Sequence, residues 1–352
     1  MITFIRRPYD RYTRVFLTFL FLVTGLAAAP VVNVNASDQD KTRETARISV
    51  LVATGMPGGT YYRVGLGMAS LWTTRLRATG IRVSAAISEG SRENIEAIRI
   101  ADADLILAES AFCTMAYSGT GIYEDNPLPE LRSVTALWPD VVHFLIRSEA
   151  MRSGTLADLE GVTVATGLPE SGARYTTQMV LGTLKSGGKS VQLRSMSNMA
   201  AAEALRNGTV QALTVTGGIP VPLVVTLLQE NPGRFSLLEI AEPSFMALRD
   251  RNVMNILRLV IPPRTYPGQV NAVKSVGFGN VLATTSSLSS QVVYQLTKTL
   301  YQNLDYLTGV HPACREIGLD RAFRDVQIPL HPGAILYFRE RNVDIPEHLV
   351  PR

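Results

Sequence analysis

Strand-like runs alternate with helix-like segments along most of this chain, and this alternation constrains the fold more than any other feature. Apolar, β-rich runs stand at residues 48–53, 81–86 and 104–108. The segment from residue 60 onward instead places apolar side chains at helical spacing, and a second helix is expected to begin at Ser91. Because parallel strands are joined by crossover connections, usually helices, this order predicts an α/β fold with a parallel sheet covered on both faces.

The pattern occurs a second time beyond residue 140. Further strands are expected at residues 141–146, 162–166, 191–194, 210–215 and 276–283, and a long helix is expected to follow from about residue 292. A chain of 352 residues is long for a single core. We therefore predict two α/β lobes with a ligand cleft between them. The chain crosses between the lobes near Val141–Arg147 and Ser275–Ala283, which we predict to be the hinge.

One helix start is predicted from its capping residues alone. Thr155 stands where it can cap a helix amino terminus, and Asp158 three residues later can return a hydrogen bond to it.

The first 36 residues have the three parts of a secretory signal peptide. An arginine-rich start precedes an apolar run over residues 15–23, and small residues follow at 27–29. The alternative is a transmembrane anchor, but the apolar run is shorter than the roughly 20 residues that a span requires. We predict a Sec-type signal peptide over residues 1–36, cleaved after Ala36 because Pro30 disfavours a cut after Ala29. The mature protein is expected in the periplasm.

Composition excludes several classes of protein. With 46% hydrophobic residues the chain has enough apolar surface for a core, so disorder is excluded. The formal charge of +4 lies mostly in the leader, so no nucleic-acid partner is implied. Two cysteines, Cys113 and Cys314, cannot form a disulfide scaffold; an oxidising compartment permits one bond, and two buried free thiols are the alternative.

Residues typical of enzymes are sparse. The four histidines show no metal-ligand spacing, and no G-x-S-x-G sequence is present. Ser186 and Lys189 match S-x-x-K by letter but flank two glycines, as a flexible loop does. Asp102 and Asp104 alternate at a strand start and would point to opposite faces. We therefore predict no catalytic residues, no metal and no cofactor.

Two loops do indicate a ligand. Residues 55–60 follow a strand and open a helix without G-K-[ST], so their backbone N–H groups suit an anion but not a nucleotide P-loop. Residues 169–174 have the same form. There Ser171 offers a hydroxyl and Arg174 offers two parallel bonds to a carboxylate; a surface salt bridge is the alternative for Arg174. Tyr61 is interpreted either as a pocket wall or as an ordinary core aromatic.

Taken in order, these loops resemble the TAXI family of solute-binding proteins, which serve tripartite ATP-independent periplasmic (TRAP) transporters. The resemblance covers nearly the whole mature chain. It rests on Gly58-Gly59-Thr60-Tyr61-Tyr62, Ser88-Glu89-Gly90-Ser91-Arg92-Glu93-Asn94, Ala101-Asp102-Ala103-Asp104-Leu105, Tyr117-Ser118-Gly119-Thr120-Gly121, Leu156-Ala157-Asp158-Leu159-Glu160-Gly161, Ser171-Gly172, Tyr266-Pro267-Gly268-Gln269 and His331-Pro332-Gly333-Ala334.

The resemblance implies a two-lobed type II periplasmic-binding-protein fold that captures an amino acid or a carboxylate, such as glutamate or 2-oxoglutarate, and delivers it to TRAP permease subunits in the membrane. The lobes it implies are residues 47–141 plus 270–352 and residues 142–269 of a monomer. Carried over residue by residue, its ligand-binding positions are Thr60, Tyr61, Ser91, Glu109, Ser110, Ser171, Gly172, Arg174, Thr216 and Gly217.

The chain departs from the family pattern at three of its motifs. Glu109-Ser110-Ala111 stands where the family often has Gln-Ser-Asp, Ala173 replaces a common Thr, and Arg63 replaces a Pro. A pocket with Glu109 and Arg174 on opposite walls would suit a zwitterion, with the ammonium against Glu109 and the carboxylate against Arg174. The same lobes docking to a sensor kinase, as a periplasmic ligand sensor, are the alternative function.

Overall fold

The computed structural model describes residues 48–169, 171–251 and 255–351. The predicted signal peptide and its cleavage site lie outside the described residues. Within the described residues, no helix is both long enough and apolar enough to span a membrane.

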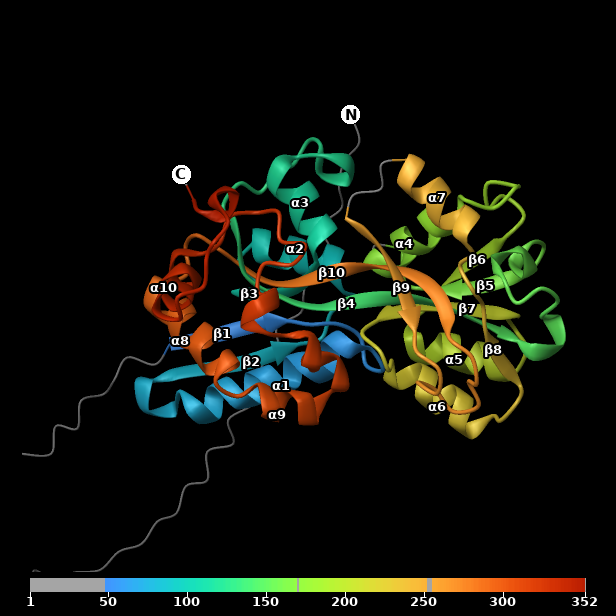
Figure 1. The fold of residues 1–352 in the computed structure, drawn as a ribbon, viewed down its shortest axis with the longest axis horizontal. Coiled ribbons are helices and arrows are strands. Elements are labelled where there is room, and N and C mark those ends of the chain that lie inside the picture. The colour runs from blue at the N-terminus through green and yellow to red at the C-terminus, as the bar shows by residue number, and fades with distance from the viewer. Residues whose placement is uncertain (1–47, 170, 252–254, 352) are drawn as a thin grey trace, which may run out of the picture. The chain divides into compact units, whose positions relative to one another are not determined.

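In the described residues, ten strands form one mixed sheet in the order β2-β1-β3-β10-β4-β7-β5-β6, with β8 paired to β4 and β9 paired to β10 (Figure 1). The strands are β1 (Ile48–Ala53), β2 (Ile81–Ala86), β3 (Leu105–Glu109), β4 (Leu131–Arg147), β5 (Thr163–Thr166), β6 (Gln192–Ser195), β7 (Ala212–Gly217), β8 (Phe235–Leu237), β9 (Ile256–Ile261) and β10 (Val273–Thr285). The predicted parallel pairing holds only in two outer groups, β2-β1-β3 and β6-β5-β7. Between them β10 and β4 pair antiparallel with each other and with their neighbours, so a purely parallel sheet was the wrong expectation.

The two central strands are long and each pairs with two groups of neighbours. Residues 131–141 of β4 face β10, and residues 141–146 face β7. Residues 280–284 of β10 face β3, and residues 273–278 face β9. Both strands are buried over most of their length. The sheet is therefore continuous across the positions where the sequence predicts the hinge.

Buried side chains gather separately on either side of that crossing. One core cluster contains residues between 50 and 138 and between 281 and 349, and two others contain residues between 141 and 276. Residues 48–140 plus 279–351 are called the first half below, and residues 141–278 the second half. The lobe boundaries predicted after residues 141 and 269 stay a prediction. Cys113 and Cys314 are free thiols, buried in the first-half core.

Helices cover the sheet in both halves (Figure 1). They are α1 (Thr60–Arg75), α2 (Ser91–Arg99), α3 (Ser110–Ser118), α4 (Gly172–Leu181), α5 (Asn198–Arg206), α6 (Pro222–Glu230), α7 (Glu242–Asp250), α8 (Ser290–Tyr301), α9 (Leu304–Val310) and α10 (Pro332–Glu340). Helices α1, α2, α4 and α5 each begin within a few residues of a strand end, where the sequence has a turn. This connection places their amino termini at the ends of the strands.

The predicted capping pair is only half present. The Thr155 hydroxyl accepts a hydrogen bond from the Ala157 N–H, but the element it caps is a single 3₁₀ turn over Leu156–Leu159. The Asp158 carboxylate accepts from the backbone N–H groups of residues 152–154 and not from Thr155. The preceding turn offers Asp158 three N–H donors, and these replace the reciprocal bond that the spacing predicted.

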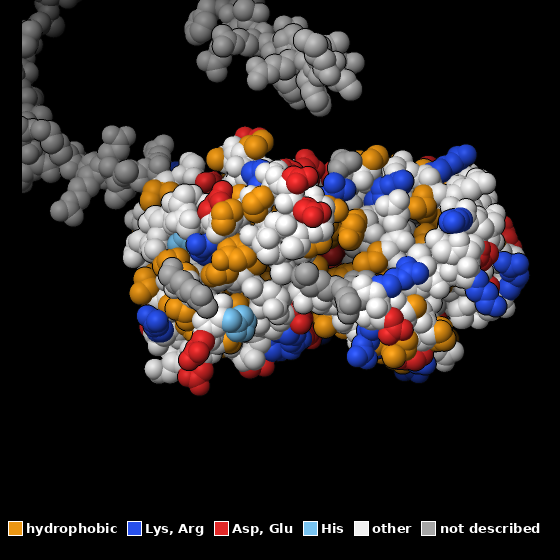
Figure 2. All heavy atoms as spheres, turned by 90° about the horizontal axis from the view of Figure 1, so that it is seen from above, with side chains coloured by type: hydrophobic (Ala, Val, Ile, Leu, Met, Phe, Trp, Pro, Cys, Tyr) orange, Lys and Arg blue, Asp and Glu red, His pale blue; other side chains and the backbone are white. Residues whose placement is uncertain are grey.

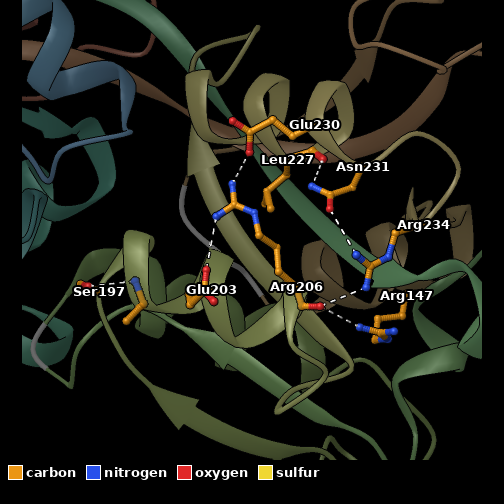
Figure 3. A network of polar contacts seen from close by, with 9 residues as sticks. Arg147, Ser197, Glu203, Arg206, Leu227, Glu230, Asn231 and Arg234 are labelled. Carbon is orange, nitrogen blue, oxygen red and sulfur yellow. Dashed lines mark hydrogen bonds and ion pairs between the residues drawn. The ribbon is translucent and has the colours of Figure 1, made fainter.

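A polar network fixes α5 against its neighbours in the second half (Figure 3). The Arg206 guanidinium bridges the carboxylates of Glu203 and Glu230, which joins α5 to α6. At the carboxyl end of α5, the guanidinium of Arg147 donates to the carbonyl of Leu205 and that of Arg234 to the carbonyl of Arg206. Cations at this end of a helix satisfy its free carbonyls and oppose its dipole. The network orients α5, whose other end reaches the site described next.

Candidate functional site

The amino termini of four helices meet at one small cavity between the halves. Helices α1 and α2 belong to the first half, and α4 and α5 to the second. The cavity has a volume of about 70 Å³ and is lined by Gly55, Met56, Gly59, Thr60, Tyr61, Glu89, Gly90, Ser91, Glu109, Asp140, Gly167, Ser171, Gly172, Ala173, Asn198, Val215, Thr216 and Gly217. The first N–H groups of a helix have no partner within it, and the helix dipole favours negative charge there. The cavity therefore suits a small ligand with an anionic group.

Eight of the ten predicted site residues line this cavity. They are Thr60, Tyr61, Ser91, Glu109, Ser171, Gly172, Thr216 and Gly217. Ser110 and Arg174 are not among the lining residues. The Ser110 hydroxyl instead accepts a long hydrogen bond of 3.4 Å from the Asn255 side chain.

The Arg174 side chain makes its hydrogen bond within the second half, to which it belongs, and not at the ligand position predicted for it. Its guanidinium donates to the Ser195 hydroxyl, and its backbone N–H donates to the Ser171 hydroxyl at 3.2 Å, which makes Ser171 the cap of α4. None of the described residues that line the cavity is Lys or Arg. The structure thus does not place Arg174 on a wall opposite Glu109. On the second half's side the cavity is lined instead by Ser171, Gly172 and Ala173 at the start of α4.

Two buried carboxyl groups line the cavity. Glu109 ends β3 and Asp140 lies in β4, and each is only 4% exposed. Desolvation by burial, together with the nearby Asp140 charge, raises the pKa of Glu109 to about 8. Desolvation also raises the pKa of Asp140 to about 7, against hydrogen bonds from Trp138, Asn280 and Gly218 that lower it. A ligand cation beside them would replace lost hydration and favour their charged forms.

A chain of hydrogen bonds holds the cavity wall in place. The Tyr61 hydroxyl bonds to the side-chain oxygen of Asn280, whose amide donates to the Trp138 carbonyl at 2.9 Å. The Trp138 indole N–H then donates to Asp140 Oδ1 at 2.8 Å. Tyr61 is therefore both a core aromatic and part of the wall, and the two interpretations of it were not exclusive.

Asp140, Asn198 and Glu89 are lining residues that were not predicted. Asp140 could have been found, because it is the one carboxylate in the buried and mostly apolar strand from residue 131 to residue 147. Asn198 begins α5 directly after its capping residue Ser197. Glu89 belongs to the Ser88–Asn94 motif of the family resemblance but was not among the predicted site residues.

Contacts between the halves close one side of the cavity. The Thr60 hydroxyl donates to the Gly218 carbonyl at 2.9 Å, and the Leu223 N–H donates to the Gly58 carbonyl at 3.2 Å. The Thr216 hydroxyl, by contrast, is buried at the cavity without a hydrogen-bond partner. A buried hydroxyl without a partner is costly, so Thr216 is available to a ligand.

The buried histidines have structural partners. His143 contacts the Val141 carbonyl and the Tyr266 hydroxyl, each at 2.8 Å, and burial lowers its pKa to about 4. His331 caps α10, since its ring Nδ1 accepts a hydrogen bond from the Gly333 N–H. In the parts of the chain that the structure describes, no three His, Cys, Asp or Glu residues gather as metal ligands would.

The two carboxyl groups predict a pH dependence of stability. Their pKa values in the folded protein lie above the ordinary values of 4.5 and 3.8. The folded state therefore keeps protons that the unfolded chain releases, and stability falls as pH rises through the folded pKa values. Between pH 6.5 and 8 we expect the free energy of unfolding in urea to fall by on the order of 1–2 kcal/mol. The decline should be shallower in Glu109→Gln; an equal decline in both proteins would show that Glu109 is already charged.

Two long strands run through both halves of the mixed sheet, and the cavity lies between the halves. This arrangement defines the chain as a protein of the type II periplasmic-binding-protein fold. One solved structure with a similar fold is that of MatC from Rhodopseudomonas palustris with bound malate. It is 17% identical with a TM-score of 0.52, and the match covers 84% of this chain and 97% of that one. The chain belongs to the NMT1-like family, whose model matches residues 52–341.

Two further solved structures are more distant. A protein of Bordetella bronchiseptica RB50 is 16% identical with a TM-score of 0.49, over 86% of each chain. The GluR0 ligand-binding core from Nostoc punctiforme, in complex with L-glutamate, is 14% identical with a TM-score of 0.44, over 76% of this chain and 97% of that one. At these identities the ligand of this chain has to be argued from its own cavity.

Proposed function

We propose that this protein is an extracytoplasmic solute-binding receptor that captures a small amino acid or carboxylate between its two halves. The observation that carries the proposal is the cavity itself. Two buried carboxyl groups and the first turns of four helices face one small volume, with no described Lys or Arg beside them.

This arrangement favours a zwitterion over a simple anion. The ligand ammonium takes the side of Glu109 and Asp140, where it offsets the cost of burying two carboxylates. The ligand carboxylate takes the N–H groups at the start of α1, α2, α4 and α5. The buried Thr216 hydroxyl supplies one further hydrogen bond. Malate, bound by the MatC structure, has carboxylates but no amine, so an amino acid and malate test different parts of this proposal.

Capture operates by closure of the two halves. Each half supplies two of the four helix termini, so the full set of ligand contacts exists only when the halves meet. The bonds from Thr60 to Gly218 and from Leu223 to Gly58 stabilise that closed arrangement. The crossing strands β4 and β10 act as the hinge.

The proposed partner is the membrane permease of a TRAP transporter, reached in the periplasm after export. The support for this partner is the order of the TAXI-like motifs, and the support for export is the signal-peptide pattern of residues 1–36. The protein itself performs no chemistry on the solute.

Thermal melting of the purified protein against a panel of solutes tests the proposal. A ligand at 100 times its dissociation constant stabilises the native state by about 2.7 kcal/mol, which raises the melting temperature by a few degrees. We expect a shift with amino acids at pH 8 and a smaller shift, or none, with malate and 2-oxoglutarate. If no amino acid and no carboxylate raises the melting temperature, the receptor assignment is wrong.

A further inference from the structure

A second cavity lies against the same carboxyl group. Its volume is about 350 Å³, and it is lined by Glu109, Ala111, Phe112, Met115, Thr120, Gly121, Tyr175, Thr176, Met179, Arg251 and Phe278. Most of these side chains are apolar. They come from α3 of the first half, α4 of the second half and the central strand β10. Glu109 is the residue common to this cavity and to the first one.

Strand register explains why the two cavities adjoin. Glu109 of β3 lies directly opposite Asn280 of β10, and Asp140 of β4 lies opposite Phe278. Opposed residues share one face of a sheet, and so do residues two apart along a strand. The two carboxyl groups, which line the first cavity, and Phe278, which lines the second, therefore lie side by side over β3, β10 and β4.

Phe112 lines the second cavity and lies close to a residue that lines the first. A Cβ on Gly172, which lines the first cavity, would lie 3.2 Å from the Phe112 ring. The same ring packs edge-to-face on Tyr175, with the ring centroids 5.5 Å apart. The first turn of α4 therefore contacts both cavities, and movement of the halves changes both together.

The first cavity is too small for a whole amino acid of ordinary size. A water-sized group needs about 10–15 Å³ of such volume, so 70 Å³ holds roughly five of them. That is enough for an ammonium, a Cα and a carboxylate, but not for a long side chain as well. A side chain on that Cα has to continue into a neighbouring space.

Of the two neighbouring spaces, the one beyond Glu109 fits an apolar group. The other shares Glu89 with the first cavity, and its lining places Arg92, Glu93 and Glu96 beside Ile122, Tyr123, Asn126, Leu168 and Pro169, so an apolar group there would lie next to three more charged residues. In the apolar cavity the guanidinium of Arg251 already donates to the Gly182 carbonyl at 2.9 Å, at the end of α4. The side chains of Phe112, Met115, Met179 and Phe278, which also line this cavity, are apolar and need no hydrogen-bond partner.

We propose that the cavity beyond Glu109 binds the apolar side chain of an amino acid whose ammonium contacts Glu109. This inference rests on the proposed function and narrows its ligand class to amino acids with large apolar side chains. Burial of the side chain adds affinity in proportion to its apolar area.

Calorimetric titration of the unaltered protein at pH 8 tests the inference with alanine, leucine, phenylalanine, glutamate and lysine. Leucine or phenylalanine is expected to bind at least about tenfold more tightly than alanine, since each buried CH₂ contributes severalfold in affinity. If alanine binds and neither larger apolar amino acid binds more tightly, this inference fails while the proposed function stands. Tightest binding by glutamate or by lysine would mean that the ligand side chain contacts a charged residue, either Arg251 or the residues of the cavity that shares Glu89. Either result would also overturn this inference. If none of the five binds, this inference fails, and the proposed function fails with it only if malate and 2-oxoglutarate do not bind either.

A cavity-filling variant locates the effect. Ala111→Phe places a ring in the second cavity, so the ratio of the alanine and leucine dissociation constants is expected to fall toward one. Ala78→Phe is the control, since Ala78 is exposed and lines neither cavity. An unchanged ratio in folded Ala111→Phe would place the ligand side chain elsewhere. If Ala111→Phe does not fold, the ligand series on the unaltered protein still decides the question.

Discussion

Replacing Glu109 by Gln is expected to weaken amino-acid binding at pH 8 by about 100-fold. Glu109 is 4% exposed and lines both cavities, so a ligand ammonium beside it is almost fully removed from water. Truncating one member of a buried charge pair costs roughly 2–5 kcal/mol, which corresponds to a factor of thirty or more. Titration calorimetry with the tightest-binding amino acid measures the loss directly.

Two comparisons separate this effect from general damage. Glu130→Gln makes the same change at an exposed residue that lines neither cavity, and should leave affinity unaltered. A carboxylate without an amine, such as malate, should bind Glu109→Gln at least as tightly as the unaltered protein. Unchanged amino-acid affinity in Glu109→Gln would remove Glu109 from the role of amine partner.

Replacing Gly277 by Ala is expected to be the most destabilising small substitution in the central strands, at about 3 kcal/mol or more. A Cβ at this position would lie 1.8 Å from the Asp140 carbonyl oxygen and 2.6 Å from a Leu259 methyl group. The nearer of these two atoms belongs to the backbone, so the paired strands β4 and β10 have to move apart at Gly277. Urea unfolding at pH 6.5 would report the loss as a lower transition midpoint.

Gly309→Ala is the matched control. Gly309 lies in α9, and nothing stands within 4 Å of a Cβ added there. Alanine is preferred over glycine inside a helix by about 0.5–1 kcal/mol, so this variant should be slightly more stable than the unaltered protein. Equal, small effects of the two substitutions would mean that the crossing strands tolerate separation.

Local elements could be predicted from sequence because their causes are local. The runs that became β1 and β2 and the start of α2 at Ser91 were placed by apolar pattern and turn residues alone. The antiparallel centre of the sheet was not predicted. Strand direction there depends on how residues 131–147 and 273–285 meet across more than a hundred residues of chain, and no local pattern records that pairing.

The candidate site was predictable to the extent that loops determine it. Thr60, Ser91 and Ser171 stand at or next to helix starts that follow strand ends; the form of its loop indicated Ser171, whereas Thr60 and Ser91 came from the family resemblance. Arg174 was misplaced because the side-chain direction depends on a tertiary partner, the Ser195 hydroxyl, in another strand. The cavity beyond Glu109 was not visible in sequence, since its lining comes from segments far apart in the chain, among them α3, α4 and β10.

The whole chain has a net positive charge, but the face that Figure 2 shows has no continuous basic surface over the described residues. On the face that Figure 2 shows, acidic and basic side chains are interspersed over the described residues of both halves. A mixed surface of this kind provides solubility without attraction to polyanions.

The way in which the chain passes through β4 and β10 makes the second half an insertion within the first. It begins at residue 141 and ends at residue 278, on two neighbouring strands that are hydrogen-bonded to each other at Gly277 and Val141. Exchanging this segment between proteins of the same fold would need only two junctions, and both would lie where β4 and β10 pair with each other. Such a chimera would keep Glu109 and Asp140 and acquire new partners at α4 and α5. Recognition of the ammonium and of the rest of the solute can thus evolve separately, by recombination rather than by point substitution.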